Sequence, residues 1–101
     1  MRTRLDLQKL LEKTLGSHNV YFQPPPNVQM EYPAIVYKRR KIDNDFGDDL
    51  VYIQSHFYSV IVIDSNPDSP IVMDVSRIPG IQYDRNYVSD NLYHDVFTLY
   101  Y

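Results

Sequence analysis

The run Tyr93-His94-Asp95-Val96-Phe97-Thr98-Leu99-Tyr100-Tyr101 decides the interpretation of the fold, because it is an aromatic-rich strand that continues to residue 101. Loose termini are usually polar and frayed, so such a run is expected to be tied into a sheet. From Phe57 onward the sequence predicts a strand, a short helix bounded by prolines, and two further strands. With one amphipathic helix near the start, this order predicts a single small α+β domain over residues 1–101, with little room for a deep active site.

Two helices are expected, each with recognisable end signals. Thr3 is positioned to cap the first, and Asp6 three residues later makes a weakened capping box, since Glu or Gln normally supplies the return bond. Gly16 ends this helix, which is predicted over residues 4–15. A loop at residues 66–70 ends in an N-cap and a proline at the first helical position of the second helix, and Pro79-Gly80 ends it. The apolar faces are formed by Leu7, Leu10, Leu11 and Leu15, and by Ile71, Val75 and Ile78.

The remaining segments predict a mixed, mainly antiparallel sheet flanked by these helices. Residues 20–22 are extended, and a polyproline II loop follows at residues 24–26. A long strand is expected over residues 34–42, then a polar turn over 43–49, then a second long strand over 51–64. Both faces of this second strand are partly apolar from Phe57 onward, so it is expected to be central and covered on both sides. Strands at 81–88 and 92–101 form an antiparallel hairpin, and residues 33–51 form a protruding hairpin or arm.

Composition narrows the function classes. The chain has ten Tyr, four Phe and no Trp, and a formal net charge of −3. Tyr is enriched where protein surfaces meet, although it also suits half-buried strands. An acidic chain is a poor nucleic-acid binder, because phosphate binding requires a basic face. Cysteine is absent, nothing resembles a signal peptide, and the longest aliphatic run, residues 60–63, is far too short to span a bilayer. A reducing cytoplasm and no membrane are therefore expected.

No catalytic, metal or cofactor motif is found in the sequence. The serines lack nucleophile-elbow glycines, and His94 and Asp95 are strand neighbours that point to opposite faces. The three histidines occur in separate elements without ligand spacing. The acidic run at 43–49 fails the calcium-loop pattern, since its sixth position is Asp48 and its twelfth is Gln54. We therefore expect a non-enzyme without a cofactor; the alternative is a small hydrolase that uses His94 and an Asp.

The strongest charge feature is the basic run at residues 38–41, followed at once by acidic residues. On a regular strand, Lys38 and Arg40 lie on one face, and Arg39 and Lys41 on the other. One interpretation is an exposed edge whose charges discourage wrong pairing, and the other is a docking surface for an acidic partner. The candidate subunit-interface residues are Lys38, Arg39, Arg40, Lys41, Asp43, Asp45, Asp48 and Asp49.

Several segments, in order along almost the whole chain, resemble small tail-completion proteins of long-tailed bacteriophages that infect Gram-positive bacteria. They are Gly16-Ser17-His18-Asn19-Val20-Tyr21-Phe22-Gln23-Pro24-Pro25, Tyr32-Pro33-Ala34-Ile35-Val36-Tyr37, Val62-Ile63-Asp64-Ser65-Asn66-Pro67-Asp68-Ser69, Tyr83-Asp84-Arg85 and Ser89-Asp90-Asn91-Leu92-Tyr93-His94-Asp95-Val96-Phe97. Among tail-completion proteins, the family that these segments resemble is similar to the tail terminators. These segments carry no catalytic logic, so they point to relatives and not to a mechanism.

The resemblance implies a structural virion protein that forms a six-fold ring at the head-proximal end of the tail tube. Such a ring ends tube polymerisation and joins the tail to the connector of the head, so the implied partners are further copies of the chain, the tail tube protein and a head-closure or connector protein. Phage DNA passes through the lumen without specific binding, and assembly takes place in the host cytoplasm. The basic and acidic candidates would then supply opposite signs at a heterologous contact, and reversing Arg39 and Arg40 would abolish the ring. The alternatives are a head-closure or head–tail connector ring and, outside this class, the small hydrolase or a regulatory binding module.

Overall fold

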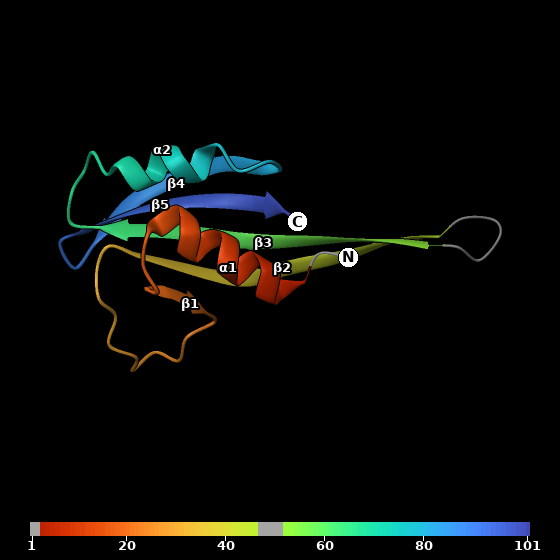
Figure 1. The fold of residues 1–101 in the computed structure, drawn as a ribbon, viewed down its shortest axis with the longest axis horizontal. Helices are drawn as coiled ribbons and strands as arrows, with labels where there is room; N and C mark the ends of the chain where they lie inside the picture. Colours follow the sequence, from red (N-terminus) through yellow and green to blue (C-terminus); the bar gives the residue numbers. More distant parts are fainter. Residues whose placement is uncertain (1–2, 47–51) are drawn as a thin grey trace.

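The structure, a computed structural model, describes residues 3–46 and 52–101. Within them the chain forms an α+β fold of two helices and a five-stranded sheet (Figure 1). In chain order the elements are α1 (Arg4–Leu15), β1 (Val20–Phe22), β2 (Ala34–Phe46), β3 (Tyr52–Asp64), α2 (Pro70–Ser76), β4 (Ile81–Ser89) and β5 (Leu92–Tyr100). The predicted bounds of the first helix and of the first short strand are confirmed.

The sheet has the strand order β1-β2-β3-β5-β4, so β3 is central, as predicted. β1 pairs with β2 in parallel, and all other neighbouring strands are antiparallel. The hairpin of β4 and β5 is closed by Asp90 and Asn91, which both have positive φ angles (53° and 64°). Asp and Asn tolerate this left-handed conformation better than most residues, which explains the tight predicted turn.

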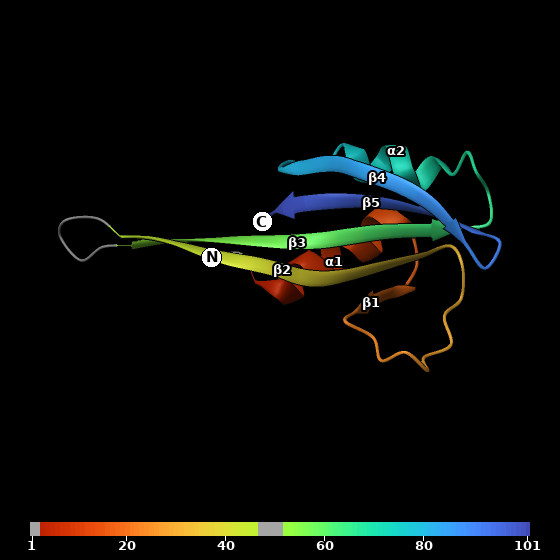
Figure 2. The same cartoon turned by 180° about the vertical axis from the view of Figure 1, so that it is seen from behind.

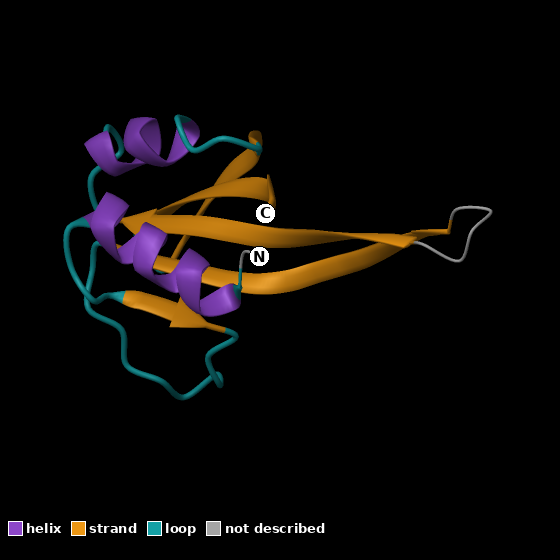
Figure 3. Ribbon diagram, turned by 45° about the vertical axis from the view of Figure 1, so that its right-hand side comes forward, coloured by secondary structure: helices purple, strands orange, loops and turns teal. Residues whose placement is uncertain are grey.

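Both helices lie on the same face of the sheet, and the core lies between them and the strands (Figures 1 and 3). α1 contributes the fully buried Leu7 and Leu11, and α2 contributes Val75. The strand residues of this core are Val20, Ile35, Tyr37, Tyr58, Val60, Val62, Phe97 and Leu99. The expectation that β3 is covered on both sides is wrong for the part of the chain that the structure describes: no described helix lies on the opposite face, seen from behind in Figure 2. We call this opposite face the open face.

The apolar side chains of the open face are nevertheless partly shielded. Val96 and Ile63 are buried, and Val36, Phe57 and Ile61 are half-buried. Neighbouring strands shield each other's small β-branched side chains, so apolar character on both faces of β3 did not require a second layer of helices. The apolar pattern on both faces of β3 therefore predicted its central position correctly, but the second layer expected over the open face was wrong.

The ends of α1 form as the sequence indicates. The Thr3 hydroxyl accepts a hydrogen bond from the Asp6 backbone N–H (3.1 Å), and the Asp6 carboxylate accepts one from the Thr3 N–H (3.0 Å). Hydrogen bonding of the Asp6 carboxylate to Thr3, chiefly to its backbone N–H, lowers the pKa of Asp6. The capping box is therefore complete with Asp in place of Glu. Gly16 ends the helix with φ of +85°, and its N–H donates to the Glu12 carbonyl (2.8 Å).

α2 is shorter than its apolar pattern indicates. It ends at Ser76 with Arg77 as its C-cap, so Ile78 lies beyond the helix although it still joins the core. Ser69 occupies the N-cap position, but its hydroxyl makes no capping bond and is buried without a hydrogen-bond partner among the described atoms. Pro70 at the first helical position, the burial of Val75 and the packing of Ile71 and Val72 against the core support this helix instead.

β2 and β3 extend well beyond the rest of the sheet and form an arm (Figures 1 and 2). The pairing of β2 with β1 ends at Tyr37, and that of β3 with β5 ends at Phe57, whereas β2 and β3 remain paired as far as Phe46 and Tyr52. The molecule is elongated as a result, with extents of 52 × 25 × 23 Å. The predicted turn at residues 43–49 is wrong for 43–46, which continue β2. Pairing with β3 satisfies the backbone groups on their inner edge and overrides the low strand propensity of Asp and Asn.

Candidate subunit interface

The basic run at residues 38–41 lies on β2 where the arm leaves the sheet, and we call it the basic stem. Its strand is irregular: Arg39 pairs with Tyr58 and Lys41 pairs with Phe57, so Arg40 is an extra residue in a β-bulge. A bulge shifts the alternation of side chains by one residue. Lys41 therefore shares the open face with Phe57, and its Nζ lies 4.9 Å from the Phe57 ring centroid. The expectation that Lys41 shares a face with Arg39 is wrong for this reason.

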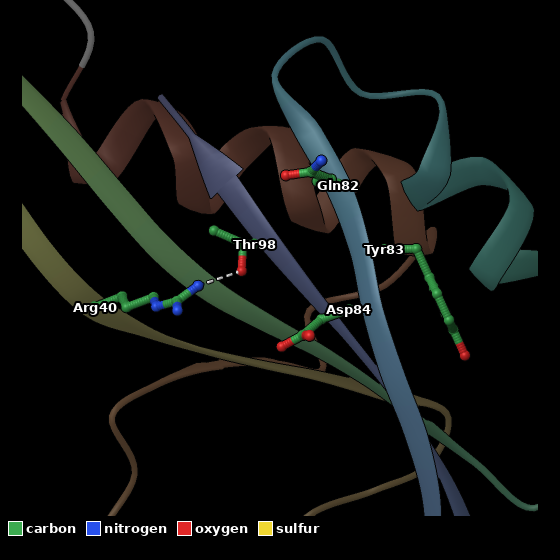
Figure 4. A pocket seen from close by; sticks show the side chains of 5 residues that line it. All are labelled: Arg40, Gln82, Tyr83, Asp84 and Thr98. Carbon is green, nitrogen blue, oxygen red and sulfur yellow. Dashed lines mark hydrogen bonds between the residues drawn. The ribbon is translucent and has the colours of Figure 1, made fainter.

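Arg40 reaches across the open face to β5. Its Nη1 donates to the Thr98 hydroxyl at 2.7 Å, although the two residues are 58 positions apart (Figure 4). Thr98 belongs to the cross-strand row that also contains Lys38 and Ser59, so Lys38 and Arg40 lie on the same face. This part of the predicted alternation agrees with the structure. A bulged position lets the long arginine side chain lie over the sheet, so its charge is held close to the surface of β5.

A shallow hollow of about 240 Å³ lies beside Arg40 (Figure 4). Its lining residues are Arg40, Gln82, Tyr83, Asp84 and Thr98, of which Asp84 is the extra residue of a second bulge, in β4. Small-molecule sites are typically about 300–1,000 Å³, deep and mostly apolar. This hollow is smaller, open and polar, so it suits a contact with a protein surface better than a small ligand.

The four cations of the basic stem differ in their partners. Lys41 forms an ion pair with Asp43 (3.2 Å) in the same strand. Arg39 lies on the helix side, where its guanidinium carbon is 6.0 Å from the Phe22 ring centroid and its backbone N–H donates to Gln23 Oε1 (3.2 Å). Within residues 3–44 and 54–101, Lys38, Arg39 and Arg40 have no carboxylate within ion-pairing distance. Three exposed cations thus remain available to an acidic partner.

Two of the four acidic candidates, Asp43 and Asp45, lie in β2 along the arm. Asp43 is partly neutralised by Lys41, and Asp45 lies near the end of β2. Asp48 and Asp49 lie outside the described residues. The opposite charges of the arm therefore already meet within one chain at Asp43, which weakens the case for the acidic arm residues as the partner of the basic stem in a second copy.

The residues considered for catalysis do not come together. His94 stacks on Tyr87 (ring centroids 4.6 Å apart, planes at 14°), and its Nδ1 lies 3.0 Å from the Leu92 carbonyl oxygen. Asp95 instead accepts a hydrogen bond from the Tyr83 hydroxyl (2.9 Å). His18 is exposed and lies 3.4 Å from Glu12. Among the described residues, no three of His, Asp and Glu are grouped as they would be to hold a metal ion.

Sequence reasoning missed one buried polar network under α1. The hydroxyl of the fully buried Tyr37 accepts a hydrogen bond from Arg4 Nη1 (3.0 Å) and donates one to Gln8 Oε1 (2.6 Å). Burial is the main cause that raises the pKa of Tyr37, and Arg4 opposes it. The position of Tyr37 at the end of an apolar run was a signal for burial, but its partners come from a helix that the sequence alone does not place.

No protein-family model matches the chain, and no curated protein matches it. Within the described part of the chain, neither helix has the length and apolarity needed to cross a membrane. The class that the fold defines is a small two-layer α+β protein with an open sheet face and a projecting two-stranded arm.

Proposed function

We propose that the chain is a structural virion protein of a long-tailed bacteriophage. In this proposal, copies of it form a ring, six-fold by resemblance to the tail terminators, at the head-proximal end of the tail tube. The ring ends tube polymerisation and joins the tail to the connector of the head. Phage DNA crosses its lumen without specific binding.

The observation that carries the proposal is the arm. Residues 43–46 and 52–55 pair only with each other as strands, beyond the ends of β1 and β5, so the outer edges of this ribbon have no strand partner in the described part of the chain. An isolated two-stranded ribbon is marginally stable in water. A second molecule that contacts this ribbon would stabilise it, and an assembly of identical copies supplies such a molecule at every position.

The surface composition supports the same proposal. Tyr32, Tyr83, Tyr87, Tyr93 and Tyr100 are among the exposed large apolar side chains. Tyr is enriched at protein–protein contacts because its ring adds apolar area while its hydroxyl remains satisfied by water or a partner. The segments that resemble tail-completion proteins contain three of these tyrosines: Tyr32, Tyr83 and Tyr93.

The test is the mass of the purified full chain by light scattering, first alone and then with the tail tube protein of the same phage. A closed oligomer, or a monomer that caps and shortens growing tubes, supports the proposal. The references are tubes polymerised alone and tubes with an unrelated protein of similar mass and charge. A chain that remains monomeric and leaves tube length unchanged refutes the terminator role. Binding to the connector without any effect on tubes would favour the head-closure alternative.

A further inference from the structure

The loops and the turn at the end of the molecule opposite the arm contain carboxylates but no Lys or Arg. This end contains the C-terminal end of β3 with the start of the loop to α2. It also contains the β4–β5 turn and the end of the loop that leads into β2 (Figures 1 and 2). Residues 17–33, 61–69 and 86–95 contain no Lys or Arg. They contain five carboxylates, of which Asp95 accepts a hydrogen bond from the Tyr83 hydroxyl; we call the other four, Glu31, Asp64, Asp68 and Asp90, the acidic end. Within the described residues, none of the four is in an ion pair.

Exposed apolar side chains accompany these carboxylates. Val88 is 61% exposed, Tyr32 45% and Tyr93 37%, and all three lie at or next to the acidic end. Tyr93 pairs with both Asp64 and Val88 across the sheet. A surface of aromatic and aliphatic side chains with charges around it has the composition of a protein contact: an apolar centre and a polar rim.

The open face beside the basic stem has the complementary composition. Lys38 and Arg40 project there, and no described carboxylate pairs with either. Val36 lies two residues before Lys38 in β2, on the same face, and pairs with Ile61 in β3; both side chains are half-buried. This face therefore offers cations next to apolar surface, whereas the acidic end offers carboxylates next to apolar surface.

We propose that the acidic end of one copy docks on the open face of the next copy, against Lys38 and Arg40. This inference rests on the proposed function, since it names the contact by which the ring closes. The two surfaces lie at different places on the molecule, so the contact is heterologous, and repetition of such a contact generates a ring or a filament. Opposite charges select this pairing and disfavour contacts between two acidic ends.

The ion pairs within one chain indicate which carboxylates are the partners of Lys38 and Arg40. The acidic arm residue Asp43 is already paired with Lys41 in its own chain. Within the described residues the four carboxylates of the acidic end have no such partner, so docking would neutralise carboxylates that no described cation neutralises. The contact should also weaken as salt rises, because exposed charges are screened beyond about 10 Å at about 0.1 M ionic strength.

The experiment uses charge reversal on both surfaces of the full chain. The first variant is Lys38→Glu with Arg40→Glu, and the second is Glu31→Lys with Asp68→Lys, whose native side chains make no hydrogen bond within the described residues. Each variant alone is expected to lose at least nine-tenths of the oligomer seen by light scattering at the wild-type assembly concentration. An equimolar mixture, and a chain that carries all four changes, are expected to recover it, because every contact then again joins opposite charges.

Arg39→Glu is the matched control. It makes the same charge change one position away, but on the helix side of β2, and is expected to leave the oligomer intact. Lys38→Glu alone guards against a folding defect, because the Lys38 side chain makes no hydrogen bond or ion pair among the described residues; circular dichroism must show each variant folded.

If the wild type assembles and both double-reversal variants assemble equally well, this contact is overturned and the proposed function stands. The same follows if Arg39→Glu disrupts the oligomer as much as the double reversals do. A wild-type chain that stays monomeric alone and on tubes would overturn the proposed function itself. Binding of double-stranded DNA by the wild type that is lost in Lys38→Glu with Arg40→Glu would assign the face to phosphate and also overturn the contact.

Discussion

Replacement of Gly80 by Ala should destabilise the fold more than the same replacement at Gly16, although both glycines have nearly the same backbone conformation. Their φ angles are +86° and +85°, in the left-handed region. An L-residue there costs about 1–2 kcal/mol. The lower entropy of the unfolded chain with Ala offsets about 0.4–1 kcal/mol of that cost. Gly16→Ala is therefore expected to lower the free energy of unfolding by about 1 kcal/mol.

The surroundings of the two glycines are different. A Cβ at Gly16 would meet no atom within 4 Å, whereas a Cβ at Gly80 would lie 2.4 Å from the carbonyl oxygen of Tyr100. The Tyr100 N–H also donates to the Gly80 carbonyl oxygen at 3.0 Å, so the loop cannot move away without stretching this bond. Loss of the bond costs about 1 kcal/mol and overpacking about 1–3 kcal/mol. Gly80→Ala should thus cost at least about 2 kcal/mol more than Gly16→Ala.

Thermal and urea unfolding, followed by circular dichroism, measure this difference. For a domain of this size, about 2 kcal/mol corresponds to a further decrease in Tm of roughly 8–16 °C. The two-state assumption is checked by coincidence of the near- and far-ultraviolet transitions. Equal losses for the two variants would refute the reasoning, since they would mean that only the left-handed backbone, and not the contact with Tyr100, constrains position 80.

Three further predictions concern the helix layer. Tyr37→Phe removes the hydrogen bonds of the buried Tyr37 hydroxyl with Arg4 and Gln8, so it should lower the free energy of unfolding by about 1–2 kcal/mol in urea titrations. No change would mean that water fully replaces the hydroxyl. Leu11→Ala should cost about 2–5 kcal/mol, because Leu11 is fully buried, and a loss below about 1 kcal/mol would contradict its place in the core. The pKa of Asp6 is lowered in the folded state, so its contribution is present above its ordinary pKa of about 4 and disappears as pH falls through the lowered value. The difference in stability between wild type and Asp6→Asn should therefore shrink below about pH 4, and a pH-independent difference would contradict this sign.

Much of the architecture could be predicted from local signals. Thr3, Asp6 and Gly16 mark the ends of α1, and the structure has the helix between them. Asp90-Asn91 marks the tight turn of the β4–β5 hairpin. These signals are local because each depends on hydrogen bonds or φ angles within a few residues. The short helix α2 was predicted on the same grounds, although Ile78 lies outside it and is buried from a loop.

The errors arose where distant segments meet. The apolar pattern of β3 shows that both faces avoid water, but it does not say whether helices or neighbouring strands provide the cover. The length of β2 depended on pairing with β3 as far as Phe46 and not on the propensity of Asp43 or Asn44. The candidate cations were found from the sequence, yet their division between the two faces was not, because nothing local to residues 38–41 reveals a bulge.

The sequence by itself therefore determined the order of the helices and strands, their capping and turns, and the positions of the exposed charges, because these follow from interactions between near neighbours. Only the tertiary structure decided that both helices share one face, that Arg40 bulges toward Thr98, and that Asp64 and the turn at Asp90 lie at the end of the sheet opposite the arm. These features depend on strand register and on the direction in which each connection crosses the sheet, and register is set by pairing between residues far apart in the chain.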